Sequence, residues 1–233
     1  MKRHDLLFIL LLSIAFAFPL ISAHQPRYVM DTNLSINSVP PYQIINPEIS
    51  QAFYAELKGE PDYYLLISNT SFNFYLQLLS PYPNGFKDFD AAIYKIENNS
   101  IDLVSLVDGA NYNWSIFYEE FAGDNYWQGP EFEKQVEAGV YVINVSNAEN
   151  NGKYSMAVGK IESFPIGESI KTLAALPEIK HDFFDKPYFA VFQGKIFQYL
   201  GIFIIVLAAV IWLIVWGIRK ILRRKIKGKK KKR

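Results

Sequence analysis

Apolar and polar residues alternate with a period of two over much of the stretch between residues 50 and 160. In residues 72–78, for example, Phe and Leu alternate with Asn, Tyr and Gln. Because successive side chains of a β-strand point to opposite faces, this period predicts strands, separated by breaks rich in Pro, Asn and Gly. We expect about eight strands and a closing one, near residues 51–57, 62–68, 72–79, 89–96, 101–107, 113–118, 131–137, 139–146 and 152–160.

These short strands predict an all-β domain, an antiparallel β-sandwich of the jelly-roll type over residues 51–160. Two stacked sheets would bury the many Phe, Tyr and Ile side chains between them. Residues 24–50 are rich in Pro, Asn and Ser, which predicts an irregular N-terminal arm. Residues 161–195 instead predict a membrane-proximal segment of one or two short helices, with a break at Pro177 and an apolar stripe of Leu173, Leu176 and Ile179.

Residues 196–218 form a long apolar run in which Ile, Leu, Val, Phe and Ala dominate and no Pro or charged residue occurs. At about 1.5 Å per residue, a helix of this length spans the roughly 30 Å hydrocarbon core of a bilayer. Aromatic residues cluster at both margins of the run, as they do in interfacial belts. The run therefore predicts one transmembrane helix.

Both ends of the chain predict a membrane topology. Residues 1–23 combine a basic start, an apolar run and small residues up to Ala23, which predicts a secretory signal peptide. Residues 219–233 hold eleven Lys and Arg and no Asp or Glu, and such segments stay on the cytoplasmic side. We expect a single-pass protein of the plasma membrane, with its N-terminal domain extracellular and with Arg219–Arg233 against anionic lipid headgroups.

The near-neutral total charge of +1 hides an asymmetry between the parts of the chain. Residues 24–195 hold 11 Lys and Arg against 22 Asp and Glu, which gives a net charge of −11. Phosphate binding needs a basic face, so this acidic middle argues against nucleic acid as a partner.

N-glycosylation is predicted by Asn-x-Ser/Thr sequons, which occur more often than the length of the chain leads one to expect. They begin at Asn33, Asn69, Asn98, Asn113 and Asn144. Asn144 alternates with Tyr141, Ile143 and Val145, so its side chain should point away from theirs. The sequons, together with the absence of cysteine, favour an archaeal cell-surface protein.

Few residues are suited to catalysis. Residues 50–160 contain no His, which leaves a Ser–His–acid arrangement without a base in the predicted sandwich. Once the signal peptide is removed, only His24 and His181 remain, and there is no Cys for thiol chemistry or zinc. No phosphate-binding glycine motif occurs either. We therefore expect no catalytic residue and no enzyme activity.

Two local clusters are candidates for binding. The acidic stretch 118–134 surrounds two glycines, and carboxylates in such loops bind calcium; the calcium hypothesis uses Glu120 and Asp124, against the alternative of a solvated acidic loop. Tyr126 and Trp127 are the candidate aromatic binding residues, against the alternative that they pack in the core. Apart from this calcium hypothesis we expect no cofactor.

The end of the β-rich region carries a family resemblance. In EAGVYVINVSNAENNGKYSMAVG, a Gly-x-Tyr start at Gly139 and Tyr141 is followed by a strand, an Asn/Gly turn and a second Gly-x-Tyr at Gly152 and Tyr154. This hairpin of about 25 residues resembles the last hairpin of pre-peptidase C-terminal domains of bacterial and archaeal surface proteins. The resemblance implies a jelly-roll fold and a surface setting, and it transfers no site residues.

Together these features predict a single-pass surface protein that displays a glycosylated, acidic β-sandwich as a non-enzymatic binding, adhesion or accessory module of the cell envelope. The expected partners are the lipid bilayer and either envelope carbohydrate or another membrane protein. The alternative is a hydrolase, based on carboxylates or calcium, that acts on extracellular carbohydrate or peptide.

Overall fold

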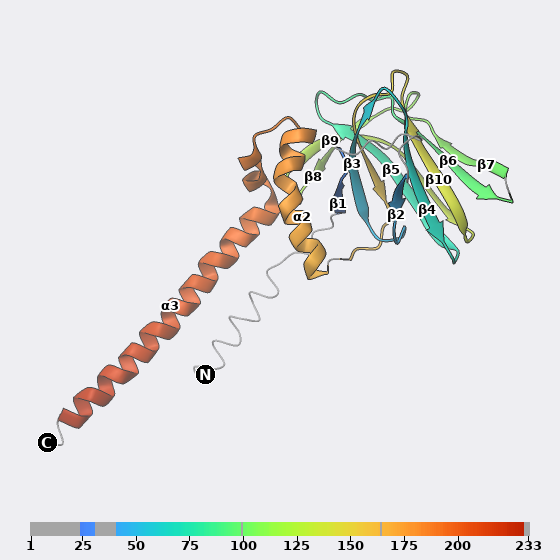
Figure 1. Cartoon of the computed structure of the whole chain (residues 1–233). Helices are drawn as coiled ribbons and strands as arrows, with labels where there is room; N and C mark the ends of the chain where they lie inside the picture. Colours follow the sequence, from blue (N-terminus) through green and yellow to red (C-terminus); the bar gives the residue numbers. More distant parts are fainter. Residues whose placement is uncertain (1–23, 31–40, 99, 164, 231–233) are drawn as a thin grey trace. The chain divides into compact units, whose positions relative to one another are not determined.

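The structure, a computed structural model, describes residues 24–30, 41–98, 100–163 and 165–230. The predicted signal peptide and the sequon at Asn33 lie outside these residues. The chain divides into a domain that ends at Gly194 and a helix that begins at Lys195. The described strands of the domain form two sheets, and short helices follow them in the sequence (Figure 1).

One sheet has six strands in the order β1-β3-β11-β5-β9-β8: Gln25–Tyr28, Gln51–Lys58, Asn151–Val158, Phe72–Pro81, Asp124–Val136 and Ser115–Glu119. The other has five strands in the order β2-β4-β10-β6-β7: Tyr42–Ile44, Asp62–Ser68, Gly139–Ser146, Asp90–Glu97 and Ser100–Val107. The last strand in the sequence, β11, pairs antiparallel with both β3 and β5 near the middle of its sheet.

The predicted β-sandwich is confirmed, and the period of two located its strands well. Both sheets are mixed, however, because β1 pairs parallel to β3 and β2 pairs parallel to β4. These two short strands come from residues 24–50, so the prediction of an irregular arm was wrong for Gln25–Tyr28 and Tyr42–Ile44. Three or four residues are too few for a period to stand out from the Pro and Asn around them.

The main core lies between the two sheets. The six-stranded sheet contributes Phe53, Phe74 and Tyr154, and the five-stranded sheet contributes Tyr64 and Tyr141, all of them buried. Ring pairs cross the interface edge to face, with centroids 5.6 Å apart for Phe53–Tyr64 and 5.8 Å apart for Phe74–Tyr141. This packing fixes which face of each strand points inward.

A second apolar cluster lies on the other side of the six-stranded sheet. The segment after β11 forms the α-helix α2 (Ile166–Glu178), a π-helical turn η1 (Ile179–Phe183) and the 3₁₀ helix η2 (Tyr188–Gln193). Ile179, Phe183 and Phe184 pack there with Tyr54 and Tyr126 of the sheet. The predicted helical segment is therefore a third layer of the domain, next to the six-stranded sheet.

Strand β9 begins at Asp124, earlier than the predicted start near residue 131. It passes through Gly129 and Pro130, which read as a break in the sequence. The register between β5 and β9 shifts between Gln77 and Leu79, at this position. A bulge tolerates Pro within a strand because it interrupts the ladder of hydrogen bonds. The early part of β9 can thus pair with β8 as well as β5.

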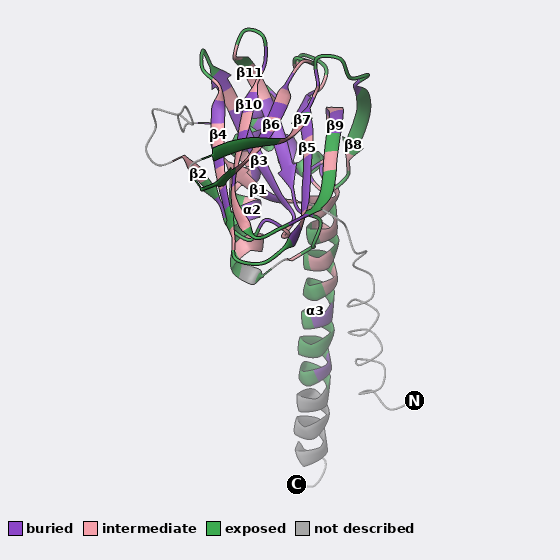
Figure 2. Ribbon diagram, turned by 90° about the vertical axis from the view of Figure 1, so that its right-hand side faces the viewer, coloured by how far each residue is buried: buried purple, intermediate pink, exposed green. Residues whose placement is uncertain are grey.

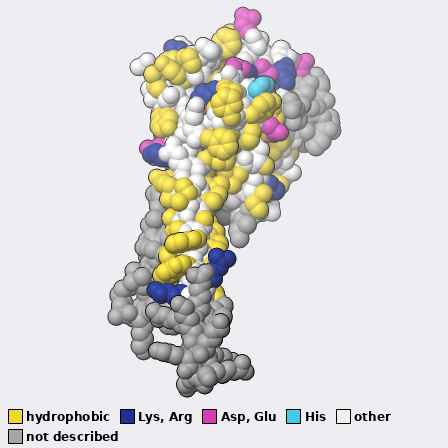
Figure 3. Space-filling model, turned by 90° about the vertical axis from the view of Figure 1, so that its left-hand side faces the viewer, with side chains coloured by type: hydrophobic (Ala, Val, Ile, Leu, Met, Phe, Trp, Pro, Cys, Tyr) yellow, Lys and Arg dark blue, Asp and Glu magenta, His cyan; other side chains and the backbone are white. Residues whose placement is uncertain are grey.

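Helix α3 (Lys195–Lys230) contains the predicted apolar segment. Its stretch Lys195–Lys220 contains an 18-residue window with a mean hydropathy of 2.8, and among the described residues it is the one helix long and apolar enough to span a membrane. Its side chains are largely exposed (Figure 2), and hydrophobic atoms cover it up to the Lys and Arg near the end of its described surface (Figure 3). The side chains of residues 221–233 lie outside the description.

We expect Gly159→Ala to destabilise the domain more than Gly59→Ala. Both glycines have positive φ, +75° and +92°. A Cβ at Gly159 would lie 2.5 Å from the carbonyl oxygen of Ile49, whereas at Gly59 it would meet open space. Strain alone costs about 1–2 kcal/mol at Gly59, and the backbone clash should raise the loss at Gly159 to roughly 3 kcal/mol or more. Urea denaturation of the full chain in mild detergent measures both losses. Equal losses would contradict the packing around Gly159.

Candidate functional site

The five-stranded sheet has an outer face that no described helix covers. We define it by the side chains that alternate with the buried ones and pair with one another across the strands. The outer face consists of Gln43, Tyr63, Leu65, Ile67, Asp90, Ala92, Tyr94, Ile96, Ile101, Leu103, Leu106, Val140, Val142, Asn144 and Ser146. Eleven of these side chains are apolar or aromatic, and the one charged member, Asp90, pairs with Ser146 at one end of the face. Five of the apolar side chains are at least 37% exposed: Ile67, Ile96, Ile101, Leu103 and Leu106.

The β8 strand is a second apolar surface, at the end of the six-stranded sheet. It pairs with β9 on one side and is the last described strand of its sheet. Ile116, Phe117 and Tyr118 are 57%, 38% and 47% exposed, and β8 is drawn mostly as exposed residues in Figure 2. Natural edge strands usually carry Lys, Pro or a bulge that prevents pairing with another chain. Strand β8, with the sequence SIFYE, carries neither Lys nor Pro.

The structure places Asp124, one of the two residues of the calcium hypothesis, in a buried ion-paired site and not in an open acidic loop. Its side chain is fully buried, and its two carboxylate oxygens accept hydrogen bonds from the Nζ atoms of Lys180 and Lys186 at 2.5 Å and 2.8 Å. Glu120 is exposed and does not share this environment. Calcium at Asp124 would have to displace two ammonium groups from a buried site, and within the described residues no cluster of three potential metal ligands occurs.

Lys180 is the residue of this cluster that the sequence did not single out. Its ammonium group also donates to the carbonyl oxygen of Ala122 at 2.7 Å, in the turn between β8 and β9. Burial lowers the pKa of Lys180, and the Asp124 carboxylate opposes that shift. The arrangement fixes η1 to the sheet. The sequence does hold a signal for this ion pair. Lys180 directly follows Ile179 of the predicted apolar stripe, and a Lys that is buried with such a stripe needs a partner of opposite charge.

Tyr126 belongs to the core, which corrects its prediction as an exposed binding residue. It is 3% exposed, its hydroxyl lies 2.8 Å from that of Tyr54, and its ring packs edge to face on Phe184 at 5.0 Å. Trp127 is half-buried. Its Nε1 donates a hydrogen bond to the carbonyl oxygen of Pro83, and the ammonium of Lys87 lies 4.4 Å from the centroid of its ring. The two neighbours thus face opposite sides of β9.

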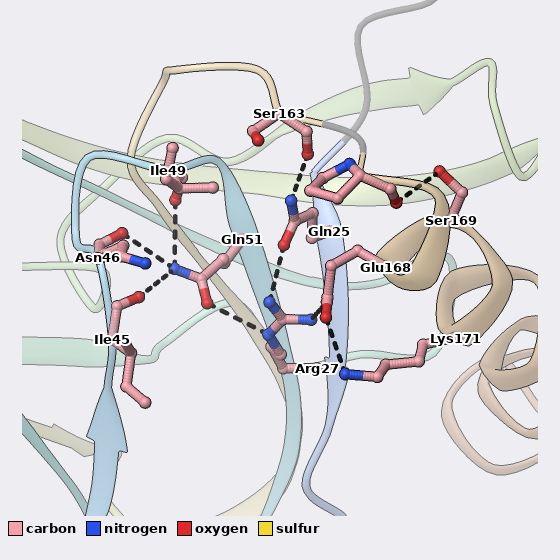
Figure 4. Close-up of polar contacts among 11 residues, drawn as sticks. Gln25, Arg27, Ile45, Asn46, Ile49, Gln51, Ser163, Glu168, Ser169 and Lys171 are labelled. Carbon is pink, nitrogen blue, oxygen red and sulfur yellow. Dashed lines mark hydrogen bonds and ion pairs between the residues drawn. The ribbon is translucent and has the colours of Figure 1, made fainter.

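A polar cluster joins β1 to the start of α2 (Figure 4). Arg27 donates to Glu168 at 2.7 Å, to the Gln25 side chain at 2.7 Å and to Gln51 at 3.2 Å. Gln51 in turn donates to the backbone of the 45–49 loop. An open hollow of about 390 Å³ lies beside these residues. Because the guanidinium and its neighbours are already partnered, we assign the cluster a structural role.

The two histidines of the described residues do not form a nucleophilic site. His24 Nδ1 lies 2.5 Å from Ser50 Oγ, but Ser50 is 1% exposed and out of reach of a substrate. Burial lowers the pKa of His24 to about 4. His181 lies in η1, stacked on Tyr188 with ring centroids 4.3 Å apart and 2.6 Å from Asp182.

Four sequons fall within the described residues. Asn69 and Asn98 lie in turns between strands, and Asn113 lies in the exposed segment before β8. Asn144 lies within β10, and its side chain points away from the buried Tyr141, Ile143 and Val145, as the alternation predicted. Modification of the sequons stays a prediction.

No family model matches the chain, and no curated protein matches it. Among solved structures, the chain is similar to the pre-peptidase C-terminal domain of a collagenase from Bacillus anthracis, at 14% identity and a TM-score of 0.33. The match covers 50% of this chain and 91% of that domain.

Asp62 gives the domain a titratable group between the sheets. Asp62 is 5% exposed and accepts a hydrogen bond from the Tyr154 hydroxyl at 2.7 Å. The Tyr154 hydroxyl in turn lies 2.8 Å from the Tyr64 hydroxyl. Burial raises the pKa of Asp62 from 3.8 to about 6, and the bond from Tyr154 opposes this shift. The folded protein therefore holds a proton that the unfolded chain releases.

We expect this proton to stabilise the domain fully below about pH 4, with the stabilisation lost as the pH rises to 6. The difference between the two pKa values corresponds to roughly 3 kcal/mol. The stability of wild type relative to Asp62→Asn should fall by about that amount between pH 4 and pH 7, because Asn does not titrate. Unfolding at both pH values measures it, with the exposed Asp102→Asn as control. A pH-independent difference would contradict the raised pKa.

Proposed function

We infer that the chain is a single-pass membrane protein that displays its β-sandwich outside the cell as a non-enzymatic binding or accessory module of the envelope. The observation that carries the anchoring is α3, whose stretch Lys195–Lys220 contains an 18-residue window with a mean hydropathy of 2.8. Exposed Ile, Leu and Trp side chains along it have no counterpart in a water-soluble helix of this length. The basic residues after it favour a cytoplasmic C-terminus.

The binding role is supported by the free edge of β8. An edge strand with exposed Ile116, Phe117 and Tyr118 offers backbone hydrogen-bonding groups and apolar side chains together. Addition of an extended strand from another protein uses both features. We therefore infer a protein partner that adds a strand beside β8, with envelope carbohydrate as the other ligand class predicted from the sequence.

The alternative, a hydrolase, has weaker support. Its calcium form used Asp124, whose carboxylate is taken by two lysines. Its carboxylate form needs two acidic side chains facing a cleft. Asp62, the carboxyl group with the raised pKa near 6, is buried between the sheets and hydrogen-bonded to Tyr154. A structural role accounts for it.

We expect single-cysteine labelling of intact cells to report the topology, because the chain has no natural Cys to interfere. Glu149→Cys lies on an exposed loop of the domain and should react with a membrane-impermeant maleimide. Lys232→Cys should react only after lysis, and alkaline carbonate should leave both proteins in the membrane pellet. Labelling of Lys232→Cys from outside, or release by carbonate, would contradict the proposed anchoring.

The edge of β8 is tested by the double variant Ile116→Lys and Tyr118→Lys. Two ammonium groups on the free edge should prevent strand addition. We expect a protein that co-purifies with the wild type in mild detergent to be lost by an order of magnitude or more, since tenfold corresponds to about 1.4 kcal/mol.

The matched control is Ile170→Lys, at a residue of α2 that is 63% exposed. It adds a charge away from β8 and should leave recovery of the partner unchanged. Equal melting temperatures for the three proteins would show that folding is intact. If the edge variant retained the partner, or if the wild type bound no protein, strand addition at β8 would be wrong even with the anchoring correct.

A further inference from the structure

The sequon at Asn144 lies on the middle strand of the five-stranded sheet, on its outer face. Strand β10 has β4 and β2 on one side and β6 and β7 on the other. Asn144 pairs with Tyr63 on β4 and with Ala92 on β6, in a row toward one end of the face. The apolar rows of Val142 and Val140 lie on one side of it along β10, and Ser146 with its partner Asp90 lies on the other.

The reactive groups of this sequon share the exposed side of the strand. Residues i and i+2 of a strand point to the same face, so Asn144 and the hydroxyl of Ser146 both point outward. Val145 between them is fully buried in the core. Asn144 and Ser146 are each half-buried. The other described sequons lie in turns or loops, where a glycan would extend away from the sheet.

The outer face is large for an uncovered surface. Four strands about 4.8 Å apart, with three outward rows about 6.6 Å apart, give an apolar area on the order of 400 Å². Apolar patches of this size on soluble proteins usually mark a surface that something else contacts. The other sheet has the helical layer over its outer face, whereas no described segment of the domain lies over this one.

We propose that an N-linked glycan on Asn144 lies across the outer face and covers it as a further layer of the domain. This rests on the proposed function, because N-glycans are added on the side of the membrane where the sandwich is displayed. The glycan is attached at one end of the apolar rows, so its first sugars reach Tyr63 and Tyr94 on the side away from the charged Asp90. The C–H faces of sugar rings pack on aromatic and aliphatic side chains, while their hydroxyls remain in water.

The attachment is an ordinary group transfer. The amide nitrogen of Asn144 forms a bond to the anomeric carbon of an oligosaccharide carried on a lipid phosphate. The bond from that carbon to the phosphate oxygen breaks, the lipid phosphate leaves with the electron pair, and the amide loses one proton. Neither oxidant nor reductant is needed. Because Asn144 lies in a strand that pairs on both sides, the proposal requires transfer before β10 pairs with β4 and β6.

A protein on the same face is the competing occupant. A second copy or another protein would have to pack flat on β4, β10 and β6, with the Asn144 side chain inside the contact. A glycan at that position would hold the two surfaces apart. Modification of Asn144 and protein packing on this face are therefore mutually exclusive, and the state of one residue distinguishes them.

The test uses the full chain purified in mild detergent from membranes of its own host. Peptide mass spectrometry reports whether Asn144 carries a glycan. Two variants, Asn144→Gln and Ser146→Ala, remove the sequon in different ways, and Asn69→Gln removes a sequon in a turn as the matched control. We expect Asn144 to be modified, and both sequon variants to bind several-fold more of the dye ANS and to self-associate in light scattering, because the apolar face becomes accessible. Asn69→Gln should do neither.

Three results would overturn the proposal. If Asn144 is bare while Asn69, Asn98 and Asn113 are modified, the sandwich is outside the cell as proposed but the face is covered by something else. If Asn144 is modified and its loss leaves ANS binding unchanged, the glycan does not lie on the face. If all described sequons are bare, the proposal fails, and cysteine labelling then tells whether the topology fails with it.

Discussion

Burial of apolar side chains on both faces of the six-stranded sheet is the constraint on which the rest of the domain depends. Its inner face packs on the five-stranded sheet through Phe53 and Phe74, and its outer face packs on the helical layer through Tyr54 and Tyr126. The second contact draws Lys180 out of water, and that charge is stable there because Asp124 lies 2.5 Å away. The ion pair between Arg27 and Glu168 joins β1 to the same helical layer. The polar groups that first suggest chemistry thus follow from the packing of this layer.

Much of the fold was predictable from the sequence, because strands of seven or more residues repeat their alternating pattern several times. Strands β3, β4 and β10 begin and end close to the predicted residues, and Asn144 points outward as expected. The apolar run of α3 needed only length and composition. Strands β1 and β2 were missed because they are short, and their pairing depends on contacts with β3 and β4 that are far away in the sequence.

The candidate site was less predictable, because exposure depends on tertiary packing. Tyr126 and Trp127 are adjacent, and only the position of the helical layer decides that Tyr126 is buried. In the sequence, Asp124 is one of several acidic residues in a predicted loop. In the fold it is paired with Lys180 and Lys186, which lie more than fifty residues away along the chain. The sequence does contain a sign of the outer face. All five residues of 63–67 are apolar or aromatic, so both faces of this strand are apolar and one of them must point outward. Local patterns cannot say what covers such a face.

The position of β11 has a consequence for how the domain is made. This strand is the last to leave the ribosome, yet it is inserted between β3 and β5, which are synthesised much earlier. Until residue 158 has emerged, those two strands lack the neighbour that joins them, and Phe53 and Phe74 have no completed sheet to pack in. Contacts this distant in sequence form slowly. The six-stranded sheet can therefore be completed only after synthesis of nearly the whole domain, and its folding is coupled to the arrival of its final strand.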